Sequence, residues 1–212
     1  MRRALLLAMF AACTPFAARD LAAAEAEAPL PATLQRAQSA AHDLTAVRLP
    51  FTQIKHLAIL DEPLTTAGAL EIDRKAGALR WEFTGQSVLI LAKGHLRRWG
   101  PDGHEENLGN DPSAQALAGQ MQALVTGDWA PLSALFALAD GPAVPDGQDR
   151  TVIFTPLTPE IGRFIAKLTI AFTASGLPST MQLDTAGGDR TEYRFAPPVA
   201  GWQPAAARFS GP

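Results

Sequence analysis

The sequence predicts a domain of the α+β class that is built on an antiparallel β-sheet. Apolar segments of strand length recur along the chain, and the breaks between them contain Gly, Pro or Asp. Most of these breaks are too short to hold a crossover helix, so consecutive strands are expected to pair antiparallel. The organising stretch is 49–81, which contains two extended segments, a break at Pro63 and a third segment that opens at Leu79.

Length and composition limit the classes of function. The 212 residues suit one domain with a sizeable core. The chain is 47% hydrophobic and 18% charged, which is compatible with an apolar ligand and equally with a high alanine content alone. The formal net charge is −3; three arginines and one aspartate in residues 1–24 give +2, which leaves −5 for the rest. A mildly acidic body argues against nucleic acid as a partner.

Residues 1–24 have the pattern of a secretory signal peptide. Two arginines follow Met1, residues 4–18 are apolar and small, and Ala22-Ala23-Ala24 supplies a cleavage site. The apolar run is shorter than the about 20 residues that a membrane-spanning helix needs. We expect export to the periplasm, with a signal peptide at 1–24, a linker at 25–32 and one domain at 33–212.

The single cysteine, Cys13, lies inside this predicted signal peptide. Cleavage after Ala24 would leave a mature domain without disulfides, cysteine nucleophiles or thiolate metal sites. The segment Phe10-Ala11-Ala12-Cys13 is also similar to a lipoprotein signal-peptidase site, in which the cysteine becomes the lipidated first residue. Both interpretations stay open from the sequence.

A helix is expected first, with Thr33 as its N-cap and an end near Ala46. Leu34, Ala37 and Ala41 recur in it at near-helical spacing. This element is either a plain surface helix or one that closes the end of a cavity.

Five strands are expected next, joined by turns such as Lys93-Gly94. They are Val47–Leu57, Leu64–Asp73, Leu79–Phe83, Ser87–Leu91 and His95–Trp99. Four apolar residues follow one another in Val88-Leu89-Ile90-Leu91, so this strand is expected to bury side chains on both of its faces.

Two helices are then expected in the middle of the sheet sequence. Asp111-Pro112 begins the first, which ends at Thr126-Gly127, and Asp128 caps the second. Their apolar faces hold Leu117, Met121, Leu124 and Val125 in the first helix, and Trp129, Leu132, Leu135 and Phe136 in the second. Such helices are expected to pack on the concave side of the sheet. For Met121 and Phe136, packing in the core and direct contact with a ligand are both open.

The sheet is expected to resume after a loop at 140–150. One or two helical turns are expected within 159–166, and from Pro197 the chain is expected to run along the surface. The four strands of this half are Thr151–Thr155, Lys167–Phe172, Ser179–Asp184 and Thr191–Phe195.

A search for catalytic patterns gives no positive result. The four histidines form no H-E-x-x-H or H-x-H pattern, so the sequence predicts no metal site. There is no G-x-S-x-G sequence, and no glycine-rich phosphate loop follows a strand. We therefore expect no enzymatic activity and no cofactor.

Three short motifs follow one another in the first half of the sheet sequence: Phe51-Thr52-Gln53, Gly68-Ala69-Leu70 and Leu79-Arg80-Trp81. Their order and spacing resemble the LolA family of periplasmic lipoprotein carriers, in particular a divergent branch of it. The closing segment Gly188-Asp189-Arg190-Thr191 also fits that branch. The resemblance covers roughly Thr33 to Phe195.

The resemblance implies an incomplete, strongly curved antiparallel β-barrel of about 10 to 11 strands, with helices covering the open concave side. It implies a monomeric carrier that binds the acyl chains of lipoproteins or related lipids. Such a carrier takes its cargo from an inner-membrane ABC-type extractor and passes it to an outer-membrane acceptor. The alternative is an anchored acceptor, similar to the LolB type, that is lipidated on Cys13.

The resemblance also implies residues for a cavity wall, a lid and a latch. Arg74 is the nearest match to a family arginine that pins the helical lid to the sheet; Arg80 as the latch, or a solvated Arg74, are the alternatives. The predicted wall and lid residues are Phe51, Leu70, Ile72, Trp81, Leu89, Leu117, Met121, Leu124 and Phe136.

Overall fold

A computed structural model describes residues 29–106, 121–122, 125–143 and 149–211. The predicted signal peptide (1–24), Cys13 and the predicted helix start at Asp111-Pro112 lie outside these residues. Leu117 and Leu124 also lie outside them. Within the described part of the chain, no helix has the length and apolar character needed to cross a membrane.

The described residues form one antiparallel sheet of 11 strands. The strands are β1 (Ala46–His56), β2 (Leu64–Asp73), β3 (Ala78–Phe83), β4 (Ser87–Ala92), β5 (His95–Trp99), β6 (Glu105–Glu106), β7 (Phe136–Ala143), β8 (Arg150–Pro156), β9 (Lys167–Phe172), β10 (Pro178–Asp184) and β11 (Arg190–Phe195). Nine of these strands fall where the sequence predicts them, with ends that differ by one residue at most.

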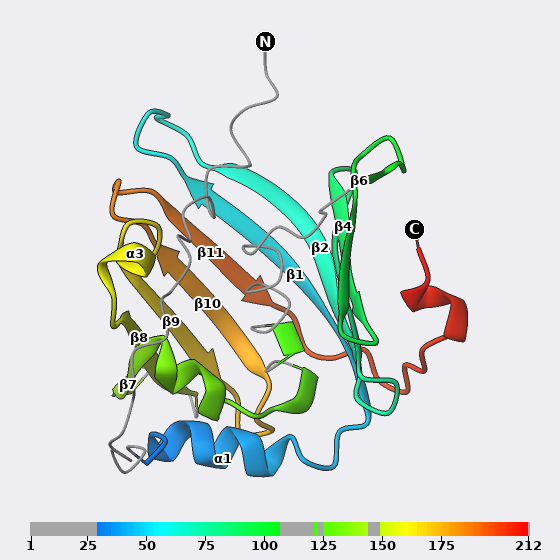
Figure 1. Ribbon diagram of the computed structural model, residues 1–212, viewed down its shortest axis with the longest axis horizontal. Coiled ribbons are helices and arrows are strands. Elements are labelled where there is room, and N and C mark those ends of the chain that lie inside the picture. The colour runs from blue at the N-terminus through cyan, green and yellow to red at the C-terminus, as the bar shows by residue number, and fades with distance from the viewer. Residues whose placement is uncertain (1–28, 107–120, 123–124, 144–148, 212) are drawn as a thin grey trace, which may run out of the picture.

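The strand order is β6-β5-β4-β3-β2-β1-β11-β10-β9-β8-β7. Two meanders, β1–β6 and β7–β11, therefore join through the pairing of β1 with β11, in which Phe51 lies opposite Phe195. The two edge strands, β6 and β7, are consecutive in the sequence, so the chain between them has to pass from one edge of the sheet to the other. Figure 1 shows β9–β11 face-on and β3–β5 edge-on, so the sheet bends strongly between these groups. The sheet is thus the predicted incomplete barrel, with an open concave side.

Strand alternation separates the concave face from the outer face. In β2, Leu70 and Ile72 belong to an apolar cluster on the concave face, whereas Glu71 points to the outer face. In β4, Leu91 packs in the concave cluster, while Ile90 packs on the outer face with Trp99. The prediction that β4 buries apolar side chains on both faces is confirmed.

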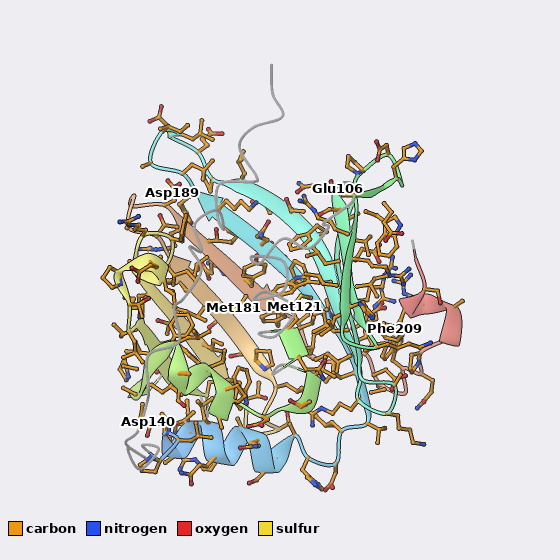
Figure 2. All side chains as sticks on the ribbon, viewed as in Figure 1. Glu106, Met121, Asp140, Met181, Asp189 and Phe209 are labelled. Atoms are coloured by element: carbon orange, nitrogen blue, oxygen red, sulfur yellow. The ribbon has the colours of Figure 1, made fainter. Side chains whose placement is uncertain are left out.

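Helix α1 (Ala32–Ala40) crosses one end of the strands (Figure 1). Its N-cap is Pro31 rather than Thr33, and the backbone N–H of Thr33 donates to Asp140 Oδ1 at 3.0 Å. Hydrogen bonding from Thr33 lowers the pKa of the Asp140 carboxyl. The helix ends at Ala40, earlier than predicted, because β1 begins at Ala46. Figure 2 shows Asp140 near the start of α1.

The prediction of a second helix through Phe136 and a loop at 140–150 is wrong in part. A short 3-10 helix, η1, covers Ala130–Ala134, and Phe136 is already the first residue of β7. Gly141 and Pro142 indicate a loop in the sequence, but they fit β7 because it lies at the edge of the sheet, where a missing backbone donor costs little. The short helix α3 (Pro159–Gly162) is confirmed.

The C-terminal segment packs on the outer face instead of merely running along the surface. Its 3-10 helix η2 (Ala206–Phe209) places Phe209 against Ile90 and Trp99, with 7% of Phe209 exposed. Arg208 forms ion pairs with the fully buried Glu71 and with Glu82. In Figure 2, β4 lies between Phe209 and the central Met121 and Met181. This segment therefore supports the half of the sheet that bends away from β9–β11.

Candidate functional site

The concave face carries two apolar clusters, one on each meander. The β1–β4 cluster contains Val47, Leu49, Phe51, Leu70, Ile72, Leu79, Leu91, Met121, Val125 and Leu177 as buried members. The β7–β9 cluster contains Leu34, Ala37, Trp129, Leu132, Phe136, Val152, Phe154, Ile165, Ile170 and Phe172. The inner wall is thus apolar across nearly the whole width of the sheet.

The connection between the two edge strands crosses this wall. Its described residues, 121–122 and 125–135, are called the crossing segment below. Met121 and Val125 belong to the β1–β4 cluster, whereas Trp129 and Leu132 belong to the β7–β9 cluster. Figure 1 shows these short green helical pieces over the concave face. The described residues of the crossing segment therefore cover the open side through apolar anchors on both clusters.

A cavity of about 50 Å³ remains between the crossing segment, α1 and the sheet. Its lining includes Ala37 and Gln38 of α1 and the following Ala41, Leu49, Leu70, Ile72 and Trp81 of the first meander, Gly127 and Trp129 of the crossing segment, and Ile170, Phe172, Met181 and Phe195 of the second meander. This space is smaller than the roughly 150 Å³ that a benzene-binding protein cavity offers. In this conformation, called the closed form below, the space is too small to hold an acyl chain.

Arg74 bridges the elements that close the cavity. Its Nη1 donates to the carbonyl oxygen of Ala41, just after α1. A Cβ atom added to Gly127, in the crossing segment, would lie 3.2 Å from Arg74 Nη2. Burial lowers the pKa of the half-buried Arg74 guanidinium. Arg80, the alternative latch, lies on the outer face, where it bonds Glu82 and the carbonyl oxygen of Gly211.

Helix α1 approaches the β9–β10 hairpin very closely at Gly176. A Cβ atom at this position would lie 2.2 Å from the carbonyl oxygen of Ala37, and Gly176 also has a φ of +76°. Only glycine fits both the conformation and the spacing. This contact holds α1 across the end of the cavity, as one of the two sequence interpretations expected.

The structure brings most of the predicted wall residues together. Those in or against the β1–β4 cluster are Phe51, Leu70, Ile72, Trp81, Leu89 and Met121, whereas Phe136 lies in the β7–β9 cluster. The sequence analysis missed the contributions of Phe172, Met181 and Phe195 to the lining. Their alternation along the second-half strands was the available signal, but nothing in it indicated which face is concave.

Comparison with known proteins gives structural likenesses only. No family model and no curated protein matches the chain. The chain is similar to solved proteins of the LolA superfamily and to others. A LolA superfamily protein from Nitrosomonas europaea is 9% identical, with a TM-score of 0.40, and the match covers 81% of this chain and 93% of that one. The Mycobacterium tuberculosis lipoprotein LppX is 13% identical with a TM-score of 0.47, over 81% of this chain and 96% of that one.

MucB is a third similar structure, 15% identical with a TM-score of 0.43 over 84% of this chain. The chain spans only 60% of the length of MucB.

An aromatic group lies at the middle of the concave wall. It consists of Phe51, Trp81, Phe83, Tyr193 and Phe195. The ring of Phe51 lies over Gly68, where an added Cβ would be 2.3 Å from the ring. The centroids of Trp81 and Tyr193 are 5.5 Å apart, so residues from both meanders meet here.

Two polar atoms beside this aromatic group have no hydrogen-bond partner among the residues that the structure describes. Gln53, 3% exposed, donates from Nε2 to Tyr193 Oη at 2.7 Å, which leaves its Oε1 unpaired. Trp81 Nε1 is also buried and unpaired with respect to the described residues. Burial raises the pKa of Tyr193 to about 12, so its hydroxyl stays neutral. An unsatisfied buried group costs about 1–3 kcal/mol, so both atoms are destabilising in the closed form.

Proposed function

We propose that this protein is a carrier that binds the acyl chains of lipoproteins or related lipids on its concave face. One observation supports this proposal above the others. A wide apolar wall is covered by the crossing segment and by α1, and a residual apolar cavity lies between them and the sheet. A cover of this kind can be displaced by a long apolar ligand, which then takes its place on the wall.

The energetics favour a binding reaction that is reversible. One chain of about 16 carbons gains about 13 kcal/mol on burial, at about 0.8 kcal/mol per CH₂. Opening exposes the anchors Met121, Val125, Trp129 and Leu132, all of which are buried in the closed form. At about 1.5–3 kcal/mol for each side chain, their exposure offsets about 6–12 kcal/mol. The net binding free energy is the difference between these two values, and it is small enough for cargo to be released to a partner.

In the proposal the carrier acts in the periplasm after signal-peptide cleavage and has no catalytic step. It receives cargo from an inner-membrane ABC-type extractor and delivers it to an outer-membrane acceptor. Such a shuttle serves either general lipoprotein traffic or one dedicated lipid pathway. The alternative is an outer-membrane acceptor anchored through a lipid on Cys13. Incorporation of labelled palmitate that is lost in Cys13→Ala would support the anchored acceptor and contradict the soluble shuttle.

Binding of a fluorescent 16-carbon acyl probe to the purified mature protein tests the proposal. The variant Leu70→Glu places a carboxylate in the cavity wall and is expected to abolish probe binding while the protein stays folded by circular dichroism. Leu64→Glu is the matched control, because Leu64 lies on the same strand but is 49% exposed near the hairpin tip. It is expected to retain binding.

Absence of probe binding to the wild type, together with an empty protein in native mass spectrometry, would contradict the carrier function. Equal effects of the two glutamate variants would contradict the placement of the site on the concave wall. A co-purifying acylated species would identify the cargo.

A further inference from the structure

We propose that Gln53 and Trp81 form a polar subsite that hydrogen-bonds a secondary amide or a hydroxyl group next to the acyl chain of the cargo. The inference rests on the proposed carrier function and specifies the chemical class of its cargo.

The first argument is the change in polarity along the concave face of β1. Leu49 and Phe51 are buried members of the β1–β4 cluster. Gln53 and Lys55 follow on the same face, because side chains of a strand alternate. Burial lowers the pKa of the Lys55 ammonium, and no ion pair of this residue is found within the described residues. The wall thus runs from apolar to neutral polar to cationic, which orients an amphiphilic ligand with its tail toward Leu49.

The second argument is the pair of unpaired atoms on this wall. Tyr193 fixes the Gln53 amide through the bond from Nε2, so the remaining Oε1 is an acceptor without a donor. Trp81 Nε1–H is a donor without an acceptor, and Trp81 also lines the cavity. Buried polar groups are normally hydrogen-bonded. A ligand that enters here relieves both deficits if it brings one donor and one acceptor.

The third argument is the chemistry of the groups that join acyl chains to their carriers. A secondary amide has an N–H that can donate to Gln53 Oε1 and a carbonyl that can accept from Trp81 Nε1. A hydroxyl group offers the same two functions. An ester or a tertiary amide offers only the acceptor, and a carboxylate would face the Gln53 oxygen with a like partial charge. The subsite therefore selects for acyl chains that carry an N–H or an O–H beside the chain.

The test is a competition assay against a fluorescent acyl probe with four ligands of equal chain length. They are N-methyldodecanamide, N,N-dimethyldodecanamide, methyl dodecanoate and 1-dodecanol. Two variants remove one function each: Gln53→Leu removes the acceptor, and Trp81→Phe removes the donor. Thr52→Val, at the neighbouring exposed position on the other face of β1, is the control.

Each variant is expected to leave a distinct pattern. Gln53→Leu should weaken the secondary amide and the alcohol about three- to tenfold and leave the tertiary amide and the ester within twofold. Trp81→Phe should weaken all ligands that contain an acceptor by a similar factor. Thr52→Val should change none of them. A larger effect of Gln53→Leu on the amide than on the alcohol would identify an N-acyl cargo, and the reverse a hydroxylated one.

Two results would overturn the inference in distinguishable ways. If the probe binds but Gln53→Leu affects secondary and tertiary amides alike, the subsite is wrong and the carrier function stands. If the wild type binds neither probe nor ligands, the carrier function fails and the subsite with it. If Gln53→Leu does not fold, Tyr193→Phe is used in its place, because it removes the hydrogen bond that fixes the Gln53 amide. The measured quantity is the ratio of the affinities for the secondary and the tertiary amide. A ratio equal to that of the wild type would contradict the subsite.

Discussion

Removal of Arg208 is expected to destabilise the sheet strongly, although this residue lies near the C-terminus in a segment without regular strands. Arg208 Nε and Nη2 donate to the two carboxylate oxygens of Glu71 at 2.8 and 3.0 Å, and Nη2 also contacts Glu82 at 2.9 Å. Glu71 is fully buried on the outer face of β2. Within the described residues, Arg208→Ala therefore leaves the buried carboxylate with Arg48, at 3.5 Å, as its one remaining ion-pair partner.

The expected magnitude follows from these contacts. Breaking a buried ion pair by removing one partner costs about 3–5 kcal/mol. The Arg208 side chain is 33% exposed, and Arg48 compensates in part, so we expect the lower end, about 3 kcal/mol. For a domain of this size that corresponds to a fall in Tm of about 6–12 °C. Its hydrogen bonds with Glu71 raise the pKa of Arg208, so the guanidinium is charged throughout the accessible pH range.

Urea denaturation of the mature protein measures the effect. Glu71→Gln in combination with Arg208→Ala is expected to be at least about 1.5 kcal/mol more stable than Arg208→Ala alone, because the uncompensated charge is gone. Arg194→Ala is the control: its ion pair with Glu192 is on the surface, and its loss should cost far less than the loss of Arg208. A cost of Arg208→Ala no larger than that of Arg194→Ala, or a double variant without recovery, would refute the reasoning.

Three further predictions concern α1 and the closed state. Gly176→Ala should lower the free energy of unfolding by about 2 kcal/mol or more, because alanine would need a left-handed backbone and would clash with α1. Thermal unfolding measures the effect. Gly187→Ala, which has neither constraint, is the control and should lower the stability far less. Asp140→Asn should cost about 0.5 kcal/mol at pH 7, because Asn keeps an acceptor for the Thr33 N–H but loses the negative charge at the start of α1. Because the pKa of Asp140 is lowered in the folded state, this difference should persist above pH 3.8 and vanish as the pH falls through the folded-state value; a difference that grows in acid would contradict it. Arg74→Leu removes the bond to Ala41 and should weaken the closed state by about 1 kcal/mol, which raises acyl-probe affinity about fivefold; a lower affinity in the folded variant would show that Arg74 does not oppose opening.

The strands could be predicted closely from the sequence, since their signals are local. The turn at Lys93-Gly94 and the run Val88–Leu91 each specify structure within a few residues, and β4 and β5 fall where predicted. The edge strand β7 was missed for an equally local reason. Gly141 and Pro142 break a strand pattern, and only the position of β7 in the sheet makes them tolerable.

The site could be predicted only in its first half. Leu70 and Trp81 came with the motifs that carry the resemblance, and both line the cavity. The Glu71–Arg208 and Gln53–Tyr193 contacts join residues 137 and 140 positions apart. No periodicity connects such distant positions, so the outer-face ion pairs and the polar subsite appear only once the strands are ordered in space.

The pairing of β1 with β11 also has a consequence for how the protein folds. Each meander consists of neighbours in sequence and can form early, whereas Gln53 and Tyr193 close a loop of 140 residues. We expect this β1–β11 pairing, the seam between the two meanders, to form last and to limit the folding rate. Trp81 comes from one meander and Tyr193 from the other, so the aromatic group at the middle of the concave wall forms only after the seam has closed. If the protein binds cargo as proposed, a ligand that contacts this aromatic group would stabilise the finished fold and not a chain in which only one meander has formed.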